Sequence, residues 1–264
     1  MNGYRYPNEQ LILFFTLLVI LVVGIVTAGA TLCLLPVFVI IASLIAYQMN
    51  MRQHAALMQR AMHVTQERAP ELYQLAKDCA RRIKPGKISL YVVPNNILNA
   101  YTFGISDPKG VVLYSPLFKV MDKDELKFII GHEFGHAALG HAWLNTMLGG
   151  MAGVPMGFGG AVISTLAFRW WNRACEYSAD RAGLLACGDP NKAVSALVKL
   201  VAHNARSQED LQRALAIIDK EDDSFGNQLR NTLSTHPMTI DRIERMQDWV
   251  KTGEYRRWQE KASR

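Results

Sequence analysis

The sequence predicts a mainly helical α+β protein, in which an N-terminal membrane anchor precedes a domain with a small sheet of about three strands. The anchor is indicated by a long apolar run, because no Asp, Glu, Lys or Arg occurs between Leu11 and Gln48. Beyond that run, apolar residues recur mainly at helical spacing, and only three short runs favour β-strands. We therefore expect an anchor at 1–50, an amphipathic helical stalk at 51–84, a folded domain at 85–250 and a basic tail at 251–264.

The apolar run is too long for one comfortable membrane span and suits two short ones. The predicted anchor is a hairpin of transmembrane helices at about Leu11–Val26 and Leu32–Tyr47, with its turn at Thr27–Thr31. One long tilted helix is the alternative interpretation. A cleaved signal peptide is excluded, because no polar mature start follows a short apolar core.

Basic residues flank the apolar run on both sides, whereas the predicted turn carries no charge. Since Lys and Arg accumulate on the cytoplasmic side, we expect an integral membrane protein of the bacterial inner membrane type, with its main domain in the cytoplasm. The net charge of +6 comes largely from residues next to the anchor. This placement favours the lipid bilayer as a partner over nucleic acid, for which no binding motif is present. The four cysteines lack CxxC spacing, which fits a reducing compartment.

Between the anchor and the later helices, the sequence predicts a stalk and a sheet. Met51–Ile83 has apolar residues at helical spacing and predicts two amphipathic helices broken at Pro70. The runs Ile88–Val93, Asn99–Phe103 and Val111–Tyr114 are rich in β-formers and predict the three strands.

The remainder of the domain is predicted to be helical. Asp122 and Glu125 form a capping-box pattern that starts a helix running to Leu139. The stretch Leu144–Phe168 is apolar but rich in glycine, so we expect two helices extended towards the bilayer and joined by a glycine-rich tip. Further helices are predicted at Ala161–Ala186, Asn191–His203, Gln208–Asp219 and Pro237–Val250.

The predicted helix at 123–139 contains the pattern HEFGH. His132 and His136 are four residues apart, so their imidazoles project from one helix face and can bind one metal ion. A catalytic zinc keeps one coordination position for water and needs a nearby carboxylate to take the proton of that water. Glu133 lies beside the two histidines and suits the role of general base. Gly131 and Gly135 would allow close approach to this helix.

Such a zinc site requires a third protein ligand. His141 is out of register with the extended pattern HExxHxxGxxH, because Leu139 and Ala142 occupy the positions of its glycine and third histidine. Glu176 is the better candidate, and Asp180, one helical turn later, could fix the tautomer of a ligand histidine. Alternatively, Glu176 and Asp180 pair with neighbouring arginines on a solvated helix face.

Four segments together make the sequence similar to a known family, the gluzincin-type membrane zinc peptidases that include HtpX and the CAAX prenyl proteases. The segments are NAYTFG at 99–104, IIGHEFGHAALGH at 129–141, RACEYSADRAGL at 173–184 and STHPMTIDRI at 234–243. The resemblance covers most of 88–246 and implies a gluzincin-type metallopeptidase domain at 85–250 with one Zn²⁺ per chain.

The resemblance also implies roles for individual residues. Glu176 matches the third zinc ligand and Asp180 its supporting carboxylate. His236 matches a histidine that stabilises the tetrahedral intermediate, although a residue before Pro237 could also simply start a helix. Arg242 matches an arginine near that histidine. Asn99, Ala100 and Tyr101 match an edge strand that binds substrate in extended form, and an ordinary sheet strand is the alternative.

We therefore expect a zinc endopeptidase that hydrolyses peptide bonds by Glu133-assisted attack of zinc-bound water, with membrane-associated or misfolded proteins as substrates. One alternative is a processing protease for a single, for example lipidated, protein. Another is a membrane adaptor without catalytic activity that keeps zinc for structure. The short glycine-rich segment after the HEFGH helix departs from relatives that carry further membrane helices there, which weakens the transfer of any one substrate.

Overall fold

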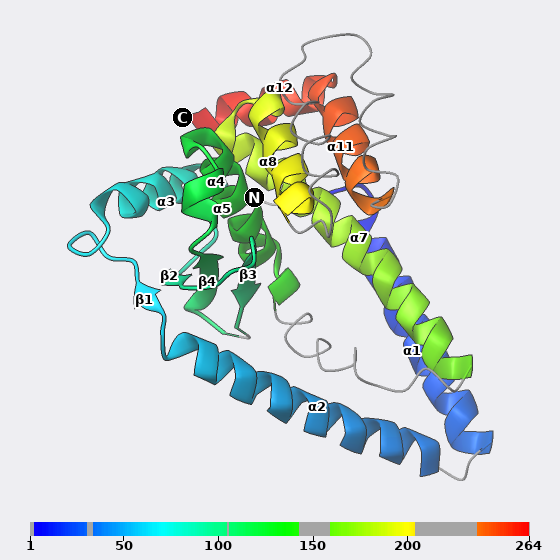
Figure 1. Cartoon of the computed structure of the whole chain (residues 1–264). Helices are drawn as coiled ribbons and strands as arrows, with labels where there is room; N and C mark the ends of the chain where they lie inside the picture. Colours follow the sequence, from blue (N-terminus) through cyan, green and yellow to red (C-terminus); the bar gives the residue numbers. More distant parts are fainter. Residues whose placement is uncertain (1–2, 31–33, 105, 143–158, 204–236, 264) are drawn as a thin grey trace.

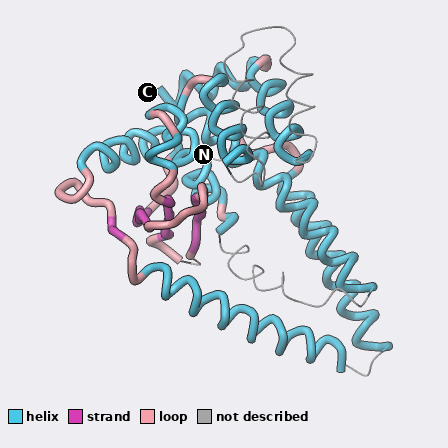
Figure 2. The backbone as a smooth tube through the Cα atoms, in the orientation of Figure 1, coloured by secondary structure: helices cyan, strands magenta, loops and turns pink. Residues whose placement is uncertain are grey.

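The structure is a computed structural model of the chain, and it describes residues 3–30, 34–104, 106–142, 159–203 and 237–263. Helices pack around one side of a small sheet, and two long helices, α1 and α7, extend away from this body side by side (Figure 1). Figure 2 shows that most of the described chain is helix and only a small part is strand. The prediction of a mainly helical protein with a small sheet is thus confirmed.

The predicted hairpin of two adjacent membrane helices is not what the structure shows. Helices α1 (Glu9–Ala30) and α2 (Leu34–Met58) diverge, and α1 instead lies alongside α7 (Gly159–Cys187) (Figure 1). A hydrogen bond contributes to the pairing of α1 with α7, because a buried hydroxyl needs a partner. Thr16 is buried and its Oγ1 donates to the carbonyl oxygen of Ala167 on α7, at 3.0 Å.

Among the described residues, one helix, Glu9–Gly29 within α1, is long and apolar enough to cross a membrane. Its apolar side chains are unusually exposed for a folded protein; Ile25, for example, is 64% exposed. The described parts of α2 and of the first half of α7 also expose large apolar side chains, including Ile40, Leu44 and Leu166.

The predicted helical stalk is only partly correct. Helix α2 continues to Met58, and the chain then forms a short strand, β1 (Met62–His63), before α3 (Pro70–Ile83) begins. Strand β1 pairs antiparallel with β2 (Ile88–Val93). A strand of two residues carries no periodic pattern, so only the free edge of β2 determines its conformation. Pro70 does start a helix, as predicted, because proline lacks the N–H that a first helical residue leaves unbonded.

The sheet has four strands in the order β1-β2-β4-β3. Strand β4 (Lys109–Tyr114) runs parallel to β2, and β3 (Ala100–Phe103) runs antiparallel to β4. All three predicted strands are confirmed, and β1 is the addition. Strand β3 therefore lies at the edge of the described sheet, where it pairs with β4.

Helix α5 (Lys123–Leu139) follows the short helix α4 (Leu117–Val120) and has the predicted capping box. Asp122 Oδ1 accepts the N–H of Glu125 at 3.0 Å, and Glu125 Oε2 accepts the N–H of Asp122 at 2.8 Å. The helix ends at Gly140, whose φ of 78° lies in the left-handed region that glycine adopts without strain.

Helix α5 packs on α7 through positions that have no room for a side chain. A Cβ at Gly131 would lie 2.3 Å from the Cβ of Ala186, and a Cβ at Gly135 would lie 2.6 Å from that of Ala182. The two glycines therefore bring the helix axes close together, as expected from the sequence.

The C-terminal helices pack against α5 and α7. Helix α8 (Pro190–His203) and helix α11 (Pro237–Val250) agree with the prediction. The segment predicted as a basic tail contains α12 (Gly253–Ser263), which packs back on the body through the buried Tyr255. The predicted helix at 208–219 and most of the glycine-rich tip lie outside the described residues.

Substituting Gly131→Ala should destabilise the protein by about 1–3 kcal/mol, because the added methyl group overlaps the side chain of Ala186. This overlap outweighs the gain in helix propensity, which is about 1 kcal/mol. The measurement is thermal unfolding in detergent, where each kcal/mol lowers the Tm by about 2–4 °C. Gly253→Ala is the matched control, since no atom lies within 4 Å of a Cβ built there. Equal Tm values for the two variants would contradict the close packing.

Candidate metal centre

The HEFGH segment lies in the second half of α5, where the helical repeat places His132 and His136 on one face. Both imidazoles are buried, with His132 9% and His136 7% exposed. Their Nε2 atoms face each other at 3.2 Å. Two ring nitrogens of α5 therefore converge at one point on the wall of a cavity.

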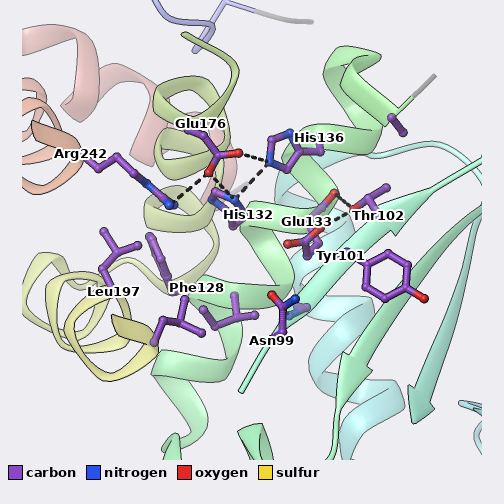
Figure 3. A pocket seen from close by; sticks show the side chains of 14 residues that line it. Asn99, Tyr101, Thr102, Phe128, His132, Glu133, His136, Glu176, Leu197 and Arg242 are labelled. Atoms are coloured by element: carbon purple, nitrogen blue, oxygen red, sulfur yellow. Dashed lines mark hydrogen bonds and ion pairs between the residues drawn. The ribbon is translucent and has the colours of Figure 1, made fainter. Parts of the chain in front are cut away.

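Glu176 on α7 completes the group, as Figure 3 shows. Its Oε2 lies 3.6 Å from His132 Nε2 and its Oε1 lies 3.4 Å from His136 Nε2. Burial lowers the pKa of His136, but the carboxylate of Glu176 outweighs burial and raises it. The negative charge that attracts a proton to this nitrogen would equally attract a metal cation.

The three side chains fit a zinc ion. Ligands around a tetrahedral zinc at about 2.0–2.1 Å lie about 3.3 Å from one another, close to the separations found here. Two imidazoles and one carboxylate are the donor set of several catalytic zinc sites, in which a fourth position remains for water or substrate. The donors and their spacing therefore agree with the zinc site expected from the sequence.

Asp180 and Arg242 support the group from behind. His132 Nδ1 lies 3.0 Å from Asp180 Oδ1, so it donates to this carboxylate and leaves the Nε2 lone pair for a metal. Arg242 on α11 donates to both oxygens of Asp180 at 2.6 and 2.8 Å. Its Nη1 also lies 3.1 Å from Glu176 Oε2. Arg242 thus orients two carboxylates, which is a positioning role.

Burial and neighbouring positive charge shift the pKa values of these carboxylates in opposite directions. Burial raises the pKa of Glu176, but Arg242 and the two imidazoles outweigh it and hold this pKa well below its ordinary value. Burial also raises the pKa of Asp180, but Arg242 and His132 together outweigh it and lower this pKa. With Glu133, the centre holds three carboxylates against the one guanidinium of Arg242, and the two remaining negative charges match one Zn²⁺.

Glu133 faces the sheet, where Thr102 of β3 holds it. Thr102 Oγ1 lies 2.6 Å from Glu133 Oε2 and 2.9 Å from the backbone oxygen of Glu133. Sequence reasoning missed Thr102, although it lies within the segment NAYTFG. Side-chain alternation along a strand offered a signal, because Ala100 and Thr102 share a face.

A cavity of about 370 Å³ opens beside this group. The predicted substrate residues Asn99, Ala100 and Tyr101 line it, together with Thr102 (Figure 3). Apolar side chains also line it, namely Phe128, Ile129, Leu197 and Leu200. The structure thus brings the predicted ligands, the predicted base and the edge strand β3 to one cavity.

Two histidines considered from the sequence lie elsewhere. His236 lies outside the described residues. His141 is buried behind His136, with its Nδ1 2.9 Å from His136 Nδ1, on the side of that ring away from Glu176. Burial lowers the pKa of His141 to about 4, so this imidazole is neutral near pH 7.

Removing the carboxylate of Asp180 should weaken zinc binding by about 10–100-fold, because His132 then loses the acceptor that fixes its ring and tautomer. The measurement is competition for zinc between a chromophoric chelator and purified Asp180→Ala protein. Asp248→Ala is the control, since Asp248 is exposed and pairs with the exposed Lys251. A folded Asp180→Ala protein with the zinc affinity of the wild type would refute this role.

Comparison with known proteins agrees with this geometry. Residues 63–250 match peptidase family M48. The plastoglobule-localized metallopeptidase 48 of Arabidopsis thaliana chloroplasts is 29% identical over 217 residues, which cover 76% of this chain and 63% of that protein. This chain therefore spans less than two thirds of the length of the plant relative.

Bacterial relatives are similar over a larger share of their length. Protease HtpX homologs of Burkholderia mallei and Burkholderia pseudomallei are 26% identical over 261 residues, covering 81% of this chain and 88% of each homolog. The family match includes all the residues of the metal centre and covers more than half of the chain. This confirms the resemblance inferred from the sequence: the chain belongs to peptidase family M48, a family of zinc metallopeptidases, and is a hydrolase.

Proposed function

We propose that this protein is a membrane-anchored zinc endopeptidase that hydrolyses peptide bonds in membrane-associated or misfolded proteins. One observation carries the proposal: His132, His136 and Glu176 converge in a cavity that also contains a carboxylate, Glu133, and is lined by an edge strand. Peptide hydrolysis needs these three elements, namely a Lewis acid, a base and a surface that holds the substrate extended.

The side chains around the cavity would have different roles in the reaction. Zinc held by His132, His136 and Glu176 would supply a Lewis acid that polarises the scissile carbonyl and makes water more acidic. Glu133 takes the proton from the attacking water and passes it to the leaving amine. Thr102 fixes the carboxylate of Glu133 through Oε2, so that the other oxygen remains available for the proton.

We further assign His236 to stabilisation of the tetrahedral intermediate. His236 directly precedes Pro237, the first residue of α11, and α11 carries Arg242, which contacts Glu176. The family resemblance carries this assignment, since a charged or donating side chain near the developing oxyanion stabilises it. The competing assignment for His236 is simply a residue at the start of a helix.

Substrate would bind along β3 as an added strand, with main-chain hydrogen bonds to Asn99, Ala100 and Tyr101. The position of β3 at the edge of the described sheet supports this, because an edge strand can accept an added strand. The end of α2 contacts this strand, since the ring centroid of His54 lies 4.2 Å from that of Phe103. A helix that comes from the anchor thus borders the substrate strand, which favours substrates associated with the membrane.

The exposed apolar surface of α1, α2 and the first half of α7 supports insertion of these helices into the bilayer. Because basic residues follow the anchor, we place the peptidase domain in the cytoplasm, as for a bacterial inner membrane protein. The domain boundaries 1–50, 51–84, 85–250 and 251–264 remain part of this proposal.

Two other functions were considered. A dedicated processing protease for one lipidated protein would use the same chemistry, and the apolar side chains that line part of the cavity would suit such a substrate. A non-catalytic adaptor is disfavoured, because structural zinc sites are usually closed by four protein ligands, whereas here three ligands face an open cavity beside a carboxylate.

Replacing the base by Glu133→Gln should lower casein cleavage by about 10²–10⁴-fold, because the amide cannot take a proton. Zinc content should stay at one ion per chain, since Glu133 is not a ligand. The measurement pairs a casein assay with zinc analysis of detergent-purified protein. Glu260→Gln, an exposed position of α12, is the control that should keep full activity. Full activity of Glu133→Gln, or a wild type that binds zinc but cleaves nothing, would count against the peptidase proposal.

Reporter fusions test the orientation. A periplasm-active phosphatase should be inactive when fused before Leu11 or after Arg264, and active when fused near Ala30, because both charged flanks face the cytoplasm. Phosphatase activity at the C-terminal fusion would overturn the cytoplasmic placement and leave the peptidase chemistry untouched.

A further inference from the structure

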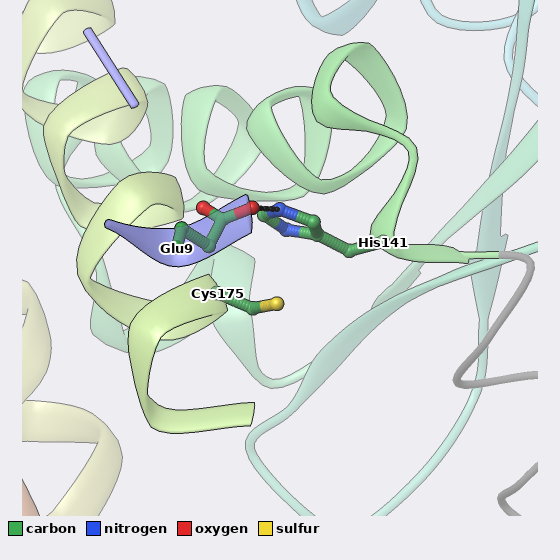
Figure 4. A group of neighbouring side chains, drawn as sticks. All are labelled: Glu9, His141 and Cys175. Atoms are coloured by element: carbon green, nitrogen blue, oxygen red, sulfur yellow. Dashed lines mark hydrogen bonds and ion pairs between the residues drawn. The ribbon is translucent and has the colours of Figure 1, made fainter. Parts of the chain in front are cut away.

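A line of buried polar groups runs from the metal centre to the first residue of the membrane helix. His141 Nδ1 lies 2.9 Å from His136 Nδ1, and His141 Nε2 lies 3.0 Å from Glu9 Oε1. The side chains of His141 and Glu9 are 2% and 1% exposed. Figure 4 shows His141 and Glu9 facing each other, with Cys175 beside them. The chemistry proposed above uses none of these three groups.

The geometry fixes the direction of the hydrogen bonds along this line. Two imidazole nitrogens 2.9 Å apart share one proton, because two N–H groups or two lone pairs would repel. If His136 Nε2 offers its lone pair to a metal, the proton of this neutral ring must lie on Nδ1, which then donates to His141. His141 in turn carries its own proton on Nε2 and donates it to the carboxylate of Glu9.

Glu9 is itself held on several sides. It forms an ion pair with Arg5, and its second carboxylate oxygen accepts the hydroxyl of Ser178 on α7. Arg5 also donates to the carbonyl oxygen of Leu139 at the end of α5, at 2.9 Å. Ser178 accepts the backbone N–H of Tyr6 at 2.8 Å. A buried carboxylate is costly unless it is fully paired, so this arrangement fixes Glu9 against both helices that carry the metal ligands.

A second metal site is the competing explanation, because Glu9, His141 and Cys175 bring one potential ligand atom each within 4.8 Å of the others. Two features oppose it. The tautomer required by a metal on His136 places a proton on His141 Nε2, the nitrogen that faces Glu9. Arg5 already neutralises Glu9, so the carboxylate has no net negative charge left to attract a further cation.

We infer that Glu9 and His141 are positioning residues for the metal ligand His136, and that they connect the membrane helix to the metal centre. This inference rests on the zinc site proposed above. Outer hydrogen-bond partners of a metal-bound histidine typically contribute about 10–100-fold to metal affinity, because they fix the ring and increase its basicity. Here the outer partner of His136 is His141, which is in turn held by Glu9, the first residue of α1, so an intact anchor becomes a condition for tight metal binding.

The test is zinc affinity, measured by chelator competition on the full-length protein in detergent. Two variants remove an acceptor from the line, His141→Leu and Glu9→Ala, and each should raise the Kd for zinc by about 10–100-fold. Two variants keep an acceptor in the same place, His141→Gln and Glu9→Gln, and should recover most of the affinity. The double variant combines His141→Leu with Glu9→Ala. It should lose no more zinc affinity than His141→Leu alone, because both changes interrupt the same series of hydrogen bonds to His136.

A matched control separates positioning from general packing. Thr16→Val removes another buried hydrogen bond between α1 and α7 without touching the line, so it should leave the Kd within about threefold of the wild type. The d–d spectrum of Co²⁺-loaded protein gives a second readout, which should change in His141→Leu and remain unchanged in Thr16→Val.

The outcomes distinguish the inference from the proposed function. Wild-type protein that binds no zinc would overturn the zinc site itself. Zinc binding that is equally tight in all five single variants, or equally weak in Thr16→Val and His141→Leu, would overturn the positioning role and leave the zinc site standing. Two zinc ions per wild-type chain, one of them lost in Glu9→Ala, would show the second metal site instead.

Discussion

The close packing of α5 on α7 sets the distance between the two histidines and the carboxylate that faces them. Gly131 and Gly135 permit this approach, because any side chain at either position would overlap an alanine of α7. Metal sites tolerate deviations of about 0.2 Å in ligand distance, which is less than the shift that an added methyl group would impose. The spacing of His132, His136 and Glu176 is therefore a consequence of helix packing, and the remaining features of the site are arranged around it.

The electrostatics of the centre explain why α11 must pack on it. Glu133, Glu176 and Asp180 place three carboxylates in a largely buried space, which would be strongly unfavourable without compensating charge. Arg242 supplies one positive charge and contacts two of the carboxylates. The charge that remains suits a divalent cation. The docking of α11 and the binding of a metal therefore both offset the repulsion among these carboxylates.

Helix α7 joins the anchor to the chemistry. Its first half lies along α1, and its second half carries Glu176 and Asp180 (Figure 1). The pairing of α1 with α7 thus replaces the expected pairing of α1 with α2, and it places Glu9 at the level of the metal centre. In this arrangement the anchor does more than hold the domain at the membrane, because its first turn contributes buried polar groups to the support of His136.

The sequence by itself determined the elements whose cause is local. The capping box at Asp122, the strands at 88–93 and 111–114, and the helix Pro237–Val250 follow from patterns within a few residues, and the HEFGH spacing places two histidines on one helix face. Only the tertiary structure decided which distant groups meet. The partner of α1, the strand β1, the contact of Thr102 with Glu133 and the line from His136 to Glu9 all join segments far apart in the chain. Such contacts depend on how buried polar groups and free strand edges find partners in three dimensions, and no local pattern encodes that choice.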